Sequence, residues 1–327
     1  MTISVGILGY GAKARFVGLL AQLESHPSVL EILLFWNGAP QDAAQLAETL
    51  GRQHGKLRLR MTHESLGSAG GYSMLLQWFE KEGTGDLLWL LDDDSIPESG
   101  CIDTLFAETR MRGFDPTHTL LMAYRADLPE FPALLKPGTR AFEPRPGVCV
   151  GVHLLNLLGP VRARAITTMG GIFLSAAPYG GLLIPRQSLR LLGLPDEKLF
   201  LYGDDTVLTL QFTRAGGTIK LCPDAVVRDS EPVWNAIGGK MGNMVRRIAH
   251  LDDRKAYYEA RNRCYLGSVF YPGNLFVYWV NRTAFLASAL FLAIRHNRLQ
   301  RFRLLHRALQ DGERMAREHV AREARNG

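Results

Sequence analysis

Three consecutive aspartates, Asp92, Asp93 and Asp94, directly follow the five apolar residues Leu87–Leu91. An apolar run of this length without alternation is typical of a strand buried on both faces, as in a parallel sheet. Ligands bind at the carboxyl ends of such strands, and clustered carboxylates repel one another unless a divalent cation is bound. We therefore predict an Mg²⁺ or Mn²⁺ site here. The alternative is a solvated turn in which Asp94 and Ser95 cap a following helix.

A second acidic pair, Asp204 and Asp205, stands at the start of the helical pattern TVLTLQ. Helix capping is one interpretation, because the unpaired N–H groups of a helix start stabilise carboxylates. The other is a general base, which a metal-assisted transferase also needs. Asp229 adds a further carboxylate at the end of the strand pattern TIKLCPDAVVRD.

Glycines occur at two places where a chain could approach a ligand closely. Gly67, Gly70 and Gly71 precede a helix pattern, and a helix start offers unpaired N–H groups to an anion. Taken alone, these three residues also fit a tight strand-to-helix turn. Gly180 and Gly181 stand at the entry to an apolar strand, which indicates a bend or close approach by a ligand.

Short apolar runs alternate with helical patterns over the N-terminal half of the chain. Four strand candidates separated by helix candidates predict an α/β domain, with a mostly parallel sheet covered by helices on both sides. The strand patterns are SVGILGY, LEILLFWNG, KLRLRMT and DLLWLLDDD, and the helix patterns are FVGLLAQLE, AAQLAETLGRQ and GYSMLLQWFEKE.

The second half of the chain is less regular. Residues 123–164 are rich in proline, arginine and glycine and are too long for an ordinary connection. Strand and helix patterns then return, and from Asp252 onward the pattern is helical. We predict a boundary near Leu251, which gives an α/β domain over residues 1–251 and a helical extension over residues 252–327.

Composition indicates a globular protein, with 46% hydrophobic and 21% charged residues among 327. The four cysteines have no metal-ligand spacing and the N-terminus has no signal-peptide layout, so we expect a cytoplasmic protein. Residues 295–327 contain nine Arg and four Asp or Glu, and so hold +5 of the net charge of +6. Because the rest of the chain is nearly neutral, we expect no nucleic-acid binding.

The segment Leu275–Ile294 is long enough to span a bilayer but has Asn281 and Arg282 near its middle. A central Arg costs about 2.5–3.5 kcal/mol on insertion, so we do not predict a transmembrane helix. One hypothesis is a helix that lies on the anionic cytoplasmic face of the inner membrane, assisted by the basic tail. The other is a buried helix that packs on the main domain.

The stretch GYGAKA, Gly9–Ala14, fits a loose dinucleotide-binding fingerprint. Such a site also needs an acidic residue at the end of the second strand, where this chain has Trp36 and Asn37. An NAD-dependent oxidoreductase is therefore an alternative with little support.

Taken together, these motifs resemble a family 2 glycosyltransferase of the GT-A fold, and are most similar to bacterial galactofuranosyl- and rhamnosyltransferase-like members. The resemblance covers roughly residues 2–266. The matching stretches are WNGA, SLGSAGG, LLDDDSIPES, GGLLIPR, LFLYGDDTVLTLQFTRAGG and YYEARNRCYL.

The resemblance implies a role for each matching residue. Asp92 and Asp94 would be metal ligands, and Asp229 stands where a third ligand, usually His, is expected. Asp205 would be the base that deprotonates the acceptor, and Asp204 would position the acceptor or the base. The donor would be bound by Asn37, Gly67, Gly70, Gly71, Asp93, Gly180 and Gly181. Trp36 and Ala39 replace the Asp and Ser common in the family, so the nucleotide contacts are the least secure part of the comparison.

Two further segments suggest donor contacts. In Gly238–His250, glycines and the pair Arg246 and Arg247 suggest a mobile loop that closes over the donor diphosphate, with a solvated basic turn as the alternative. The YYEARN stretch contains Tyr258, Arg261 and Asn262. Their side chains either line the same donor site or only contribute to packing.

The implied function is inverting transfer of a hexose, such as galactofuranose or rhamnose, from a UDP- or dTDP-sugar in cell-surface polysaccharide synthesis. The acceptor would be a glycan or a lipid-linked glycan, and the cofactor Mn²⁺ or Mg²⁺. Alternatives from other classes are a nucleotidyltransferase and an inactive membrane-surface assembly protein.

Overall fold

The computed structural model describes residues 1–11, 16–128, 130–135, 144–157, 166–168, 171–230 and 242–326. They belong to two compact units. The first unit comprises residues 1–139, 165–200 and 204–233, and the second comprises residues 140–164, 201–203 and 234–327.

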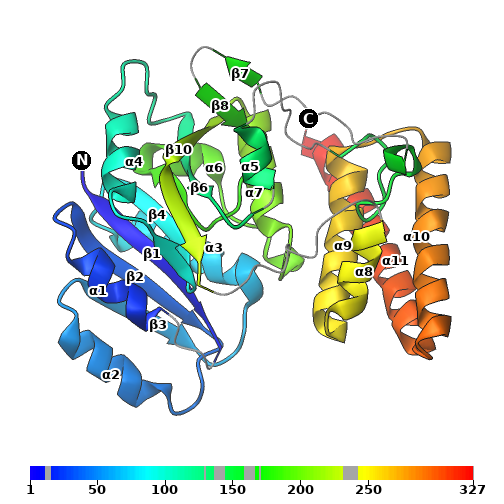
Figure 1. Ribbon diagram of the computed structural model, residues 1–327, viewed down its shortest axis with the longest axis horizontal. Coiled ribbons are helices and arrows are strands. Elements are labelled where there is room, and N and C mark those ends of the chain that lie inside the picture. The colour runs from blue at the N-terminus through cyan, green and yellow to red at the C-terminus, as the bar shows by residue number, and fades with distance from the viewer. Residues whose placement is uncertain are drawn as a thin grey trace. The chain divides into compact units, whose positions relative to one another are not determined.

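A single mixed sheet organises the first unit (Figure 1). Its main strand order is β3-β2-β1-β4-β9-β6-β10-β8-β7, and β5 pairs with β10, which makes ten strands within the described residues. β1 to β4 run parallel, as do β6 and β10, whereas β9 is antiparallel to both of its neighbours. The strands are β1 Ile3–Tyr10, β2 Val29–Asn37, β3 Leu57–Thr62, β4 Leu87–Asp92, β5 Ser95–Pro97, β6 Thr119–Arg125, β7 Ile166–Thr168, β8 Gly171–Leu174, β9 Leu182–Pro185 and β10 Thr218–Asp229.

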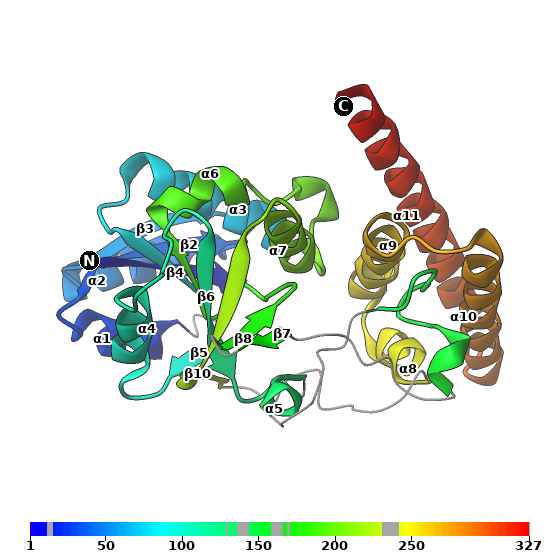
Figure 2. The same cartoon turned by 90° about the horizontal axis from the view of Figure 1, so that it is seen from above.

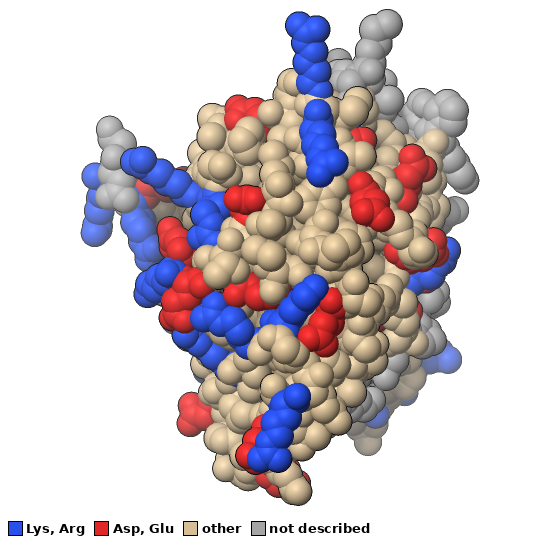
Figure 3. Space-filling model, turned by 90° about the vertical axis from the view of Figure 1, so that its left-hand side faces the viewer, with Lys and Arg blue, Asp and Glu red and all other residues tan. Residues whose placement is uncertain are grey.

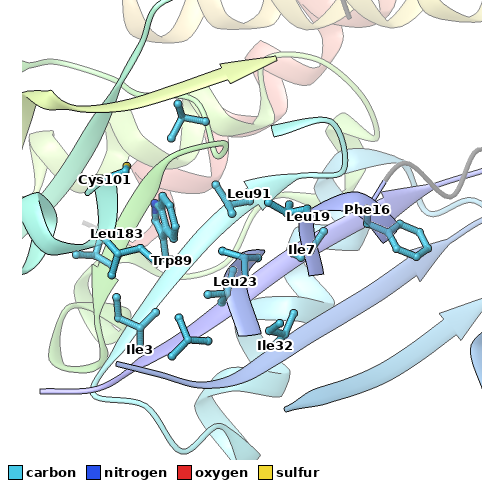
Figure 4. Close-up of a cluster of buried hydrophobic side chains, with 14 of the residues drawn as sticks. Ile3, Ile7, Phe16, Leu19, Leu23, Ile32, Trp89, Leu91, Cys101 and Leu183 are labelled. Atoms are coloured by element: carbon cyan, nitrogen blue, oxygen red, sulfur yellow. The ribbon is translucent and has the colours of Figure 1, made fainter. Parts of the chain in front are cut away.

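Helices cover both faces of this sheet, with α1 and α4 on one side and α3, α6 and α7 on the other (Figure 2). The helices of this unit are α1 Val17–Glu24, α2 Ala43–Gln53, α3 Gly67–Glu82, α4 Cys101–Thr109, α5 Glu130–Leu134, α6 Leu189–Leu192 and α7 Asp204–Arg214. Apolar side chains of α1, α2 and α4 pack on β1, β2 and β4 in one core cluster, part of which is drawn in Figure 4. Because both faces are covered, the five residues of β4 before Asp92 are all apolar and buried, as the sequence pattern predicts.

The second unit is helical and has its own core. Its longer helices are α8 Gly242–His250, α9 Asp253–Phe270, α10 Leu275–Arg295 and α11 Leu299–Asn326. These helices bury Ile248, Cys264, Phe285 and Leu309 together. Leu251, near which the sequence pattern places a boundary, is buried in the same cluster, because α8 packs with the helices that follow it.

The segment after the three aspartates does not form the helix cap that was the alternative interpretation of this motif. Ser95–Pro97 forms β5, and Ser95 pairs with Asp229 of β10. Helix α4 begins only at Cys101, after Gly100 in a left-handed conformation with a φ of 79°. Asp93 and Asp94 therefore form the turn between β4 and β5, and Ser95 is held in an extended conformation by its pairing with β10.

Charges of both signs are interspersed on the face of the first unit shown in Figure 3. Ion pairs within this unit also neutralise basic side chains. For example, Arg58 and Arg60 contact Glu82 at 3.0 and 2.7 Å.

Candidate functional site

Asp92 ends β4, which lies between β1 and β9 in the sheet. Its Oδ1 accepts a hydrogen bond from the Tyr72 hydroxyl at 2.7 Å, and its backbone N–H donates to Ser95 Oγ at 3.1 Å. The side chain is 40% exposed. Asp92 is thus oriented by its neighbours and still accessible to a ligand.

The other two aspartates connect β4 to neighbouring strand ends. The Asp93 carboxylate is buried and accepts from the backbone N–H of Tyr10 at the end of β1, at 3.1 Å. The backbone carbonyl of Asp94 accepts from Ser230, directly after β10, at 2.8 Å. The carboxyl ends of β1, β4 and β10 therefore meet at one edge, as the sequence pattern predicts.

Arg125, the last residue of β6, was not identified from the sequence, and it lies between two of the predicted metal ligands. Its side chain is 4% exposed, and it forms an ion pair with Asp229 and lies 3.5 Å from Asp92 Oδ2. It also donates to the Gly180 carbonyl at 2.7 Å. A basic residue that ends the apolar pattern TLLMAY was the available signal.

The burial of Asp229 raises the pKa of its carboxyl to about 6, although Arg125 opposes this shift. The negative charges of Asp94 and Asp92 also raise this pKa. The backbone of Asp229 is also fixed in position, because its N–H donates a hydrogen bond to Asp127 Oδ2 at 2.8 Å.

The predicted set of three aspartate ligands is not assembled in this structure. Within the described ranges, no three Asp, Glu, His or Cys side chains are grouped as a metal site, and Arg125 engages Asp229. Asp92 and Asp94 still have suitable chemistry, because Mg²⁺ is commonly held by one or two carboxylates together with substrate phosphates. The donor set thus fits a divalent cation at Asp92 and Asp94, but not with Asp229 as a ready third ligand.

The second acidic pair begins helix α7, as predicted. Asp204 is 2% exposed and accepts from Ser68 Oγ at 2.8 Å. Asp205 is half-buried, and its Oδ1 accepts from the N–H of Thr206 at 2.6 Å. Of the two carboxylates, Asp205 is therefore the more accessible to a substrate.

The chain enters α7 through strained backbone. The φ angles of Phe200 and Tyr202 are 61° and 69°, in the left-handed region that bulky residues seldom adopt. Asn262, 1% exposed, donates to the carbonyls of Leu201 and Tyr202, each at 2.8 Å. Asn262 thus fixes the turn that precedes the acidic pair in the chain.

Two tyrosines with their rings in contact lie between the acidic groups. The rings of Tyr72 and Tyr179 have centroids 3.9 Å apart. Burial raises the pKa of both phenols well above 10; the charge of Asp92 adds to the shift for Tyr72, and those of Asp204 and Asp205 for Tyr179. Both phenols stay protonated, so Tyr72 can act as the donor to Asp92. Neither tyrosine was predicted as a site residue from the sequence, although each is adjacent to a glycine that was, Gly71 or Gly180.

Asn37 and Gly67 have structural roles that differ from the predicted donor contacts. Asn37 is fully buried; its Oδ1 accepts from Leu66 N–H at 2.8 Å and its Nδ2 donates to the Gly67 carbonyl at 2.7 Å. Gly67 has a φ of +69°, and a Cβ there would collide with the Phe200 carbonyl. That carbonyl also accepts from the Ala69 N–H at 3.2 Å, so protein atoms cover the start of α3 where an anion was expected.

The remaining glycines differ in role. Gly70 and Gly71 let α3 pack closely, since added Cβ atoms would lie 2.7 Å from Leu66 Cβ and 2.5 Å from Leu8 Cδ1. Gly180 is part of the site, because a Cβ there would overlap the Asp92 carboxylate and the Arg125 guanidinium. Gly181 follows with a φ of +100° and donates to the Leu90 carbonyl at 2.7 Å, which fixes the bend into β9.

The predicted arginine loop is in part a helix. Residues 242–250 form α8, whereas residues 238–241 and the side chain of Arg246 lie outside the described part of the structure. Arg247 lies 3.7 Å from the buried Glu259, which Arg263 also contacts at 2.6 Å. Arg247 thus shares with Arg263 the role of balancing the charge of the buried Glu259 carboxylate in the second unit.

We expect Asp204→Asn to stabilise the protein more at pH 8 than at pH 5. Burial, together with the charge of Asp205, raises the pKa of Asp204 from 3.8 to about 7. A folded-state pKa above the unfolded value means that ionisation costs stability, and this cost grows as the pH rises from about 4 to about 7. One pKa unit corresponds to about 1.4 kcal/mol, so the gain should be ~2–3 kcal/mol larger at the higher pH. Urea unfolding of both proteins measures it; a pH-independent difference would contradict the prediction.

No protein-family model matches the sequence, and no curated protein matches it. Among solved structures, the chain resembles GalNAc-T7 with UDP, GalNAc and Mn²⁺, with a TM-score of 0.53 and 17% identity over 81% of this chain and 51% of that one. The chain therefore spans about half the length of GalNAc-T7. It also resembles the mannosyltransferase PcManGT from Pyrobaculum calidifontis in complex with GDP-Man and Mn²⁺, with a TM-score of 0.50 and 13% identity over 96% of this chain and 86% of that one.

At these identities the similarity concerns the fold. The mixed, mostly parallel sheet between helices, followed by C-terminal helices, is the GT-A fold that the motifs predict. Membership of family 2 and the galactofuranosyl or rhamnosyl specificity stay predictions.

Proposed function

We propose that this chain is a glycosyltransferase that uses a nucleoside-diphosphate sugar with a divalent cation. The supporting observation is that Asp92–Asp94 lies at the carboxyl end of β4 in a GT-A fold, beside the ends of β1 and β10. The two similar structures contain UDP or GDP-Man together with Mn²⁺, which agrees with a nucleotide and a cation at this sheet edge.

In this proposal each acidic group has a separate task. Asp92 and Asp94 hold the cation, which when bound offsets the charge that develops on the leaving nucleoside diphosphate. Tyr72 keeps the Asp92 carboxylate oriented. Asp205 accepts the proton of the acceptor hydroxyl, which displaces the diphosphate in a single inverting step. Asp204, hydrogen-bonded to Ser68, positions the start of α7.

The proposed donor is a UDP- or dTDP-sugar such as a galactofuranose or rhamnose donor. The proposed acceptor is a glycan or lipid-linked glycan of a cell-surface polysaccharide. These choices rest on the motif resemblance, and Mn²⁺ and Mg²⁺ are both suitable cations for carboxylate oxygens.

Thermal unfolding with UDP, dTDP, GDP or NAD, each with and without Mn²⁺, tests this function. A ligand at about 100 times its Kd adds roughly 2.7 kcal/mol of stability, so one nucleoside diphosphate should raise the Tm by several degrees only when Mn²⁺ is present. Stabilisation by NAD alone would instead support the oxidoreductase alternative. With a reactive donor, released pyrophosphate rather than nucleoside diphosphate would indicate a nucleotidyltransferase.

Helix α10 has one buried face and one exposed apolar face. Asn281, Phe285, Ala289 and Ala293 are buried within the second unit. The exposed apolar side chains are Leu275, Phe276, Trp279, Leu290, Phe291 and Ile294, and Phe276 is 75% exposed. By length and composition, α10 could also cross a membrane.

We infer that this exposed face lies on an anionic membrane surface. The two polar residues in mid-helix are satisfied by protein, since Asn281 bonds Gly147 and Leu154, and Arg282 contacts Glu313 at 2.7 Å. The basic residues of the tail begin where α10 ends, and each contributes about 1 kcal/mol of attraction near an anionic surface. A location on the cytoplasmic face of the inner membrane would suit a lipid-linked acceptor.

Co-sedimentation with phosphatidylglycerol-containing vesicles is expected to detect this binding, whereas phosphatidylcholine vesicles should bind weakly. Replacing both Trp279 and Phe291 by Ser should reduce binding about tenfold or more, because two large apolar side chains no longer enter the interface. Met111→Ser, which removes an exposed apolar side chain of the first unit, is the matched control. Equal binding by all three proteins would contradict the surface assignment, and protein that resists alkaline extraction would indicate a spanning helix.

A further inference from the structure

Arg125 is a buried cation among the aspartates of the proposed site. Its guanidinium contacts Asp92 and Asp229 and donates to the Gly180 carbonyl, and the charge of Asp94 also acts on it. The planar, forked guanidinium can contact two carboxylates at once, which a lysine ammonium cannot match.

In the absence of a donor, Arg125 disfavours binding of a divalent cation to the carboxylates that it contacts. Asp92 is the first proposed ligand, and its Oδ2 already faces the guanidinium at 3.5 Å. A fixed positive charge next to these carboxylates weakens their attraction for a second cation. Gly180 leaves no spare room on this side, because even a methyl group there would overlap both Asp92 and Arg125.

The guanidinium is not held on every side. Arg125 Nε is buried and has no hydrogen-bond partner among the described residues. A donor diphosphate provides oxygens for such an N–H group and negative charge for both cations. Without the donor, the buried Nε–H group of Arg125 therefore lacks a hydrogen bond, which costs free energy. Binding of the donor diphosphate can supply that hydrogen bond.

We propose that Arg125 makes binding of the divalent cation conditional on the nucleoside diphosphate. This inference rests on the proposed function and extends it. Without nucleotide, Arg125 neutralises Asp92 and Asp229 and disfavours the cation. With nucleotide, the diphosphate adds enough negative charge for the guanidinium and the cation to be accommodated together. The two ligands therefore strengthen each other's binding by one common factor, as linkage requires.

Binding of Mn²⁺ to the full chain, followed by the electron paramagnetic resonance signal of free Mn²⁺, tests this inference. The measurements are made with Mn²⁺ alone and with saturating UDP, dTDP or GDP. In the unmodified protein, we expect the nucleotide that binds to tighten Mn²⁺ binding strongly. In Arg125→Met, Mn²⁺ alone should bind about tenfold or more tightly than in the unmodified protein, since one neighbouring positive charge is gone. The tightening by nucleotide should shrink accordingly.

Arg186→Met is the matched control, because that guanidinium donates to backbone carbonyls of Gly83 and Gly85. It should leave Mn²⁺ binding unchanged. Arg125→Lys keeps the charge but loses the forked geometry, so its affinity for Mn²⁺ alone should lie between those of the unmodified protein and Arg125→Met. If Arg125→Met does not fold, Arg125→Lys replaces it in the test.

The outcomes separate this inference from the proposed function. If the unmodified protein binds Mn²⁺ with a nucleotide but neither Arg125 variant binds Mn²⁺ alone more tightly, the role of Arg125 is wrong and the proposed function stands. If the unmodified protein binds no Mn²⁺ with any of the nucleotides, the metal-dependent function and this inference are both overturned.

Discussion

Replacing Asp205 by Asn is expected to lower kcat for sugar transfer about 10²–10⁴-fold, which is the usual contribution of a general base. An amide cannot accept the proton of the acceptor hydroxyl, although its oxygen can still accept the Thr206 N–H that Asp205 Oδ1 binds now. The fold and donor binding should therefore be largely retained. Initial rates with the donor identified by thermal stabilisation measure the loss.

Asp204→Asn is the natural comparison for this experiment. Its carboxylate is buried and already accepts from Ser68, so its loss should alter the rate less than the loss of Asp205. Near-full turnover by Asp205→Asn, or a larger loss in Asp204→Asn than in Asp205→Asn, would contradict the assignment of the base.

Asp94→Ala should abolish the Mn²⁺-dependent part of the stabilisation by nucleoside diphosphate. Loss of a residue that only supports a metal ligand typically weakens binding 10–100-fold, so loss of a ligand should cost about 100-fold or more in Mn²⁺ affinity. The bond to the Ser230 N–H uses the backbone carbonyl of Asp94, which alanine retains. The turn should therefore keep its shape, and the change in Tm with and without Mn²⁺ reports the metal site.

Asp103→Asn controls for the loss of one negative charge, because this carboxylate is 76% exposed on α4. It should behave like the unmodified protein. If Asp94→Ala kept its Mn²⁺-dependent stabilisation, the cation would have to bind elsewhere.

The sequence by itself determined the strands and helices that follow from the local pattern of apolar and polar residues. The unbroken apolar run Leu87–Leu91 requires burial on both faces, and it forms the β4 strand of a covered sheet. The alternation of such runs with helical patterns correctly predicts β1 to β4 and the helices between them. Since ligands bind at the carboxyl ends of parallel strands, the same pattern also places the three aspartates at the edge of the sheet where a ligand is expected.

The tertiary structure alone decided which side chains contact the polar residues at this edge of the sheet. Arg125 reaches Asp229 across 104 positions of sequence, and Asn37 holds Leu66 and Gly67 at the start of α3, which looked open to an anion. Such contacts depend on strand order, and β9 inserted between β4 and β6 sets the position of Arg125 relative to Asp92. Local periodicity reports which residues are buried, but the partner of a buried charge is fixed only when distant strands are packed side by side.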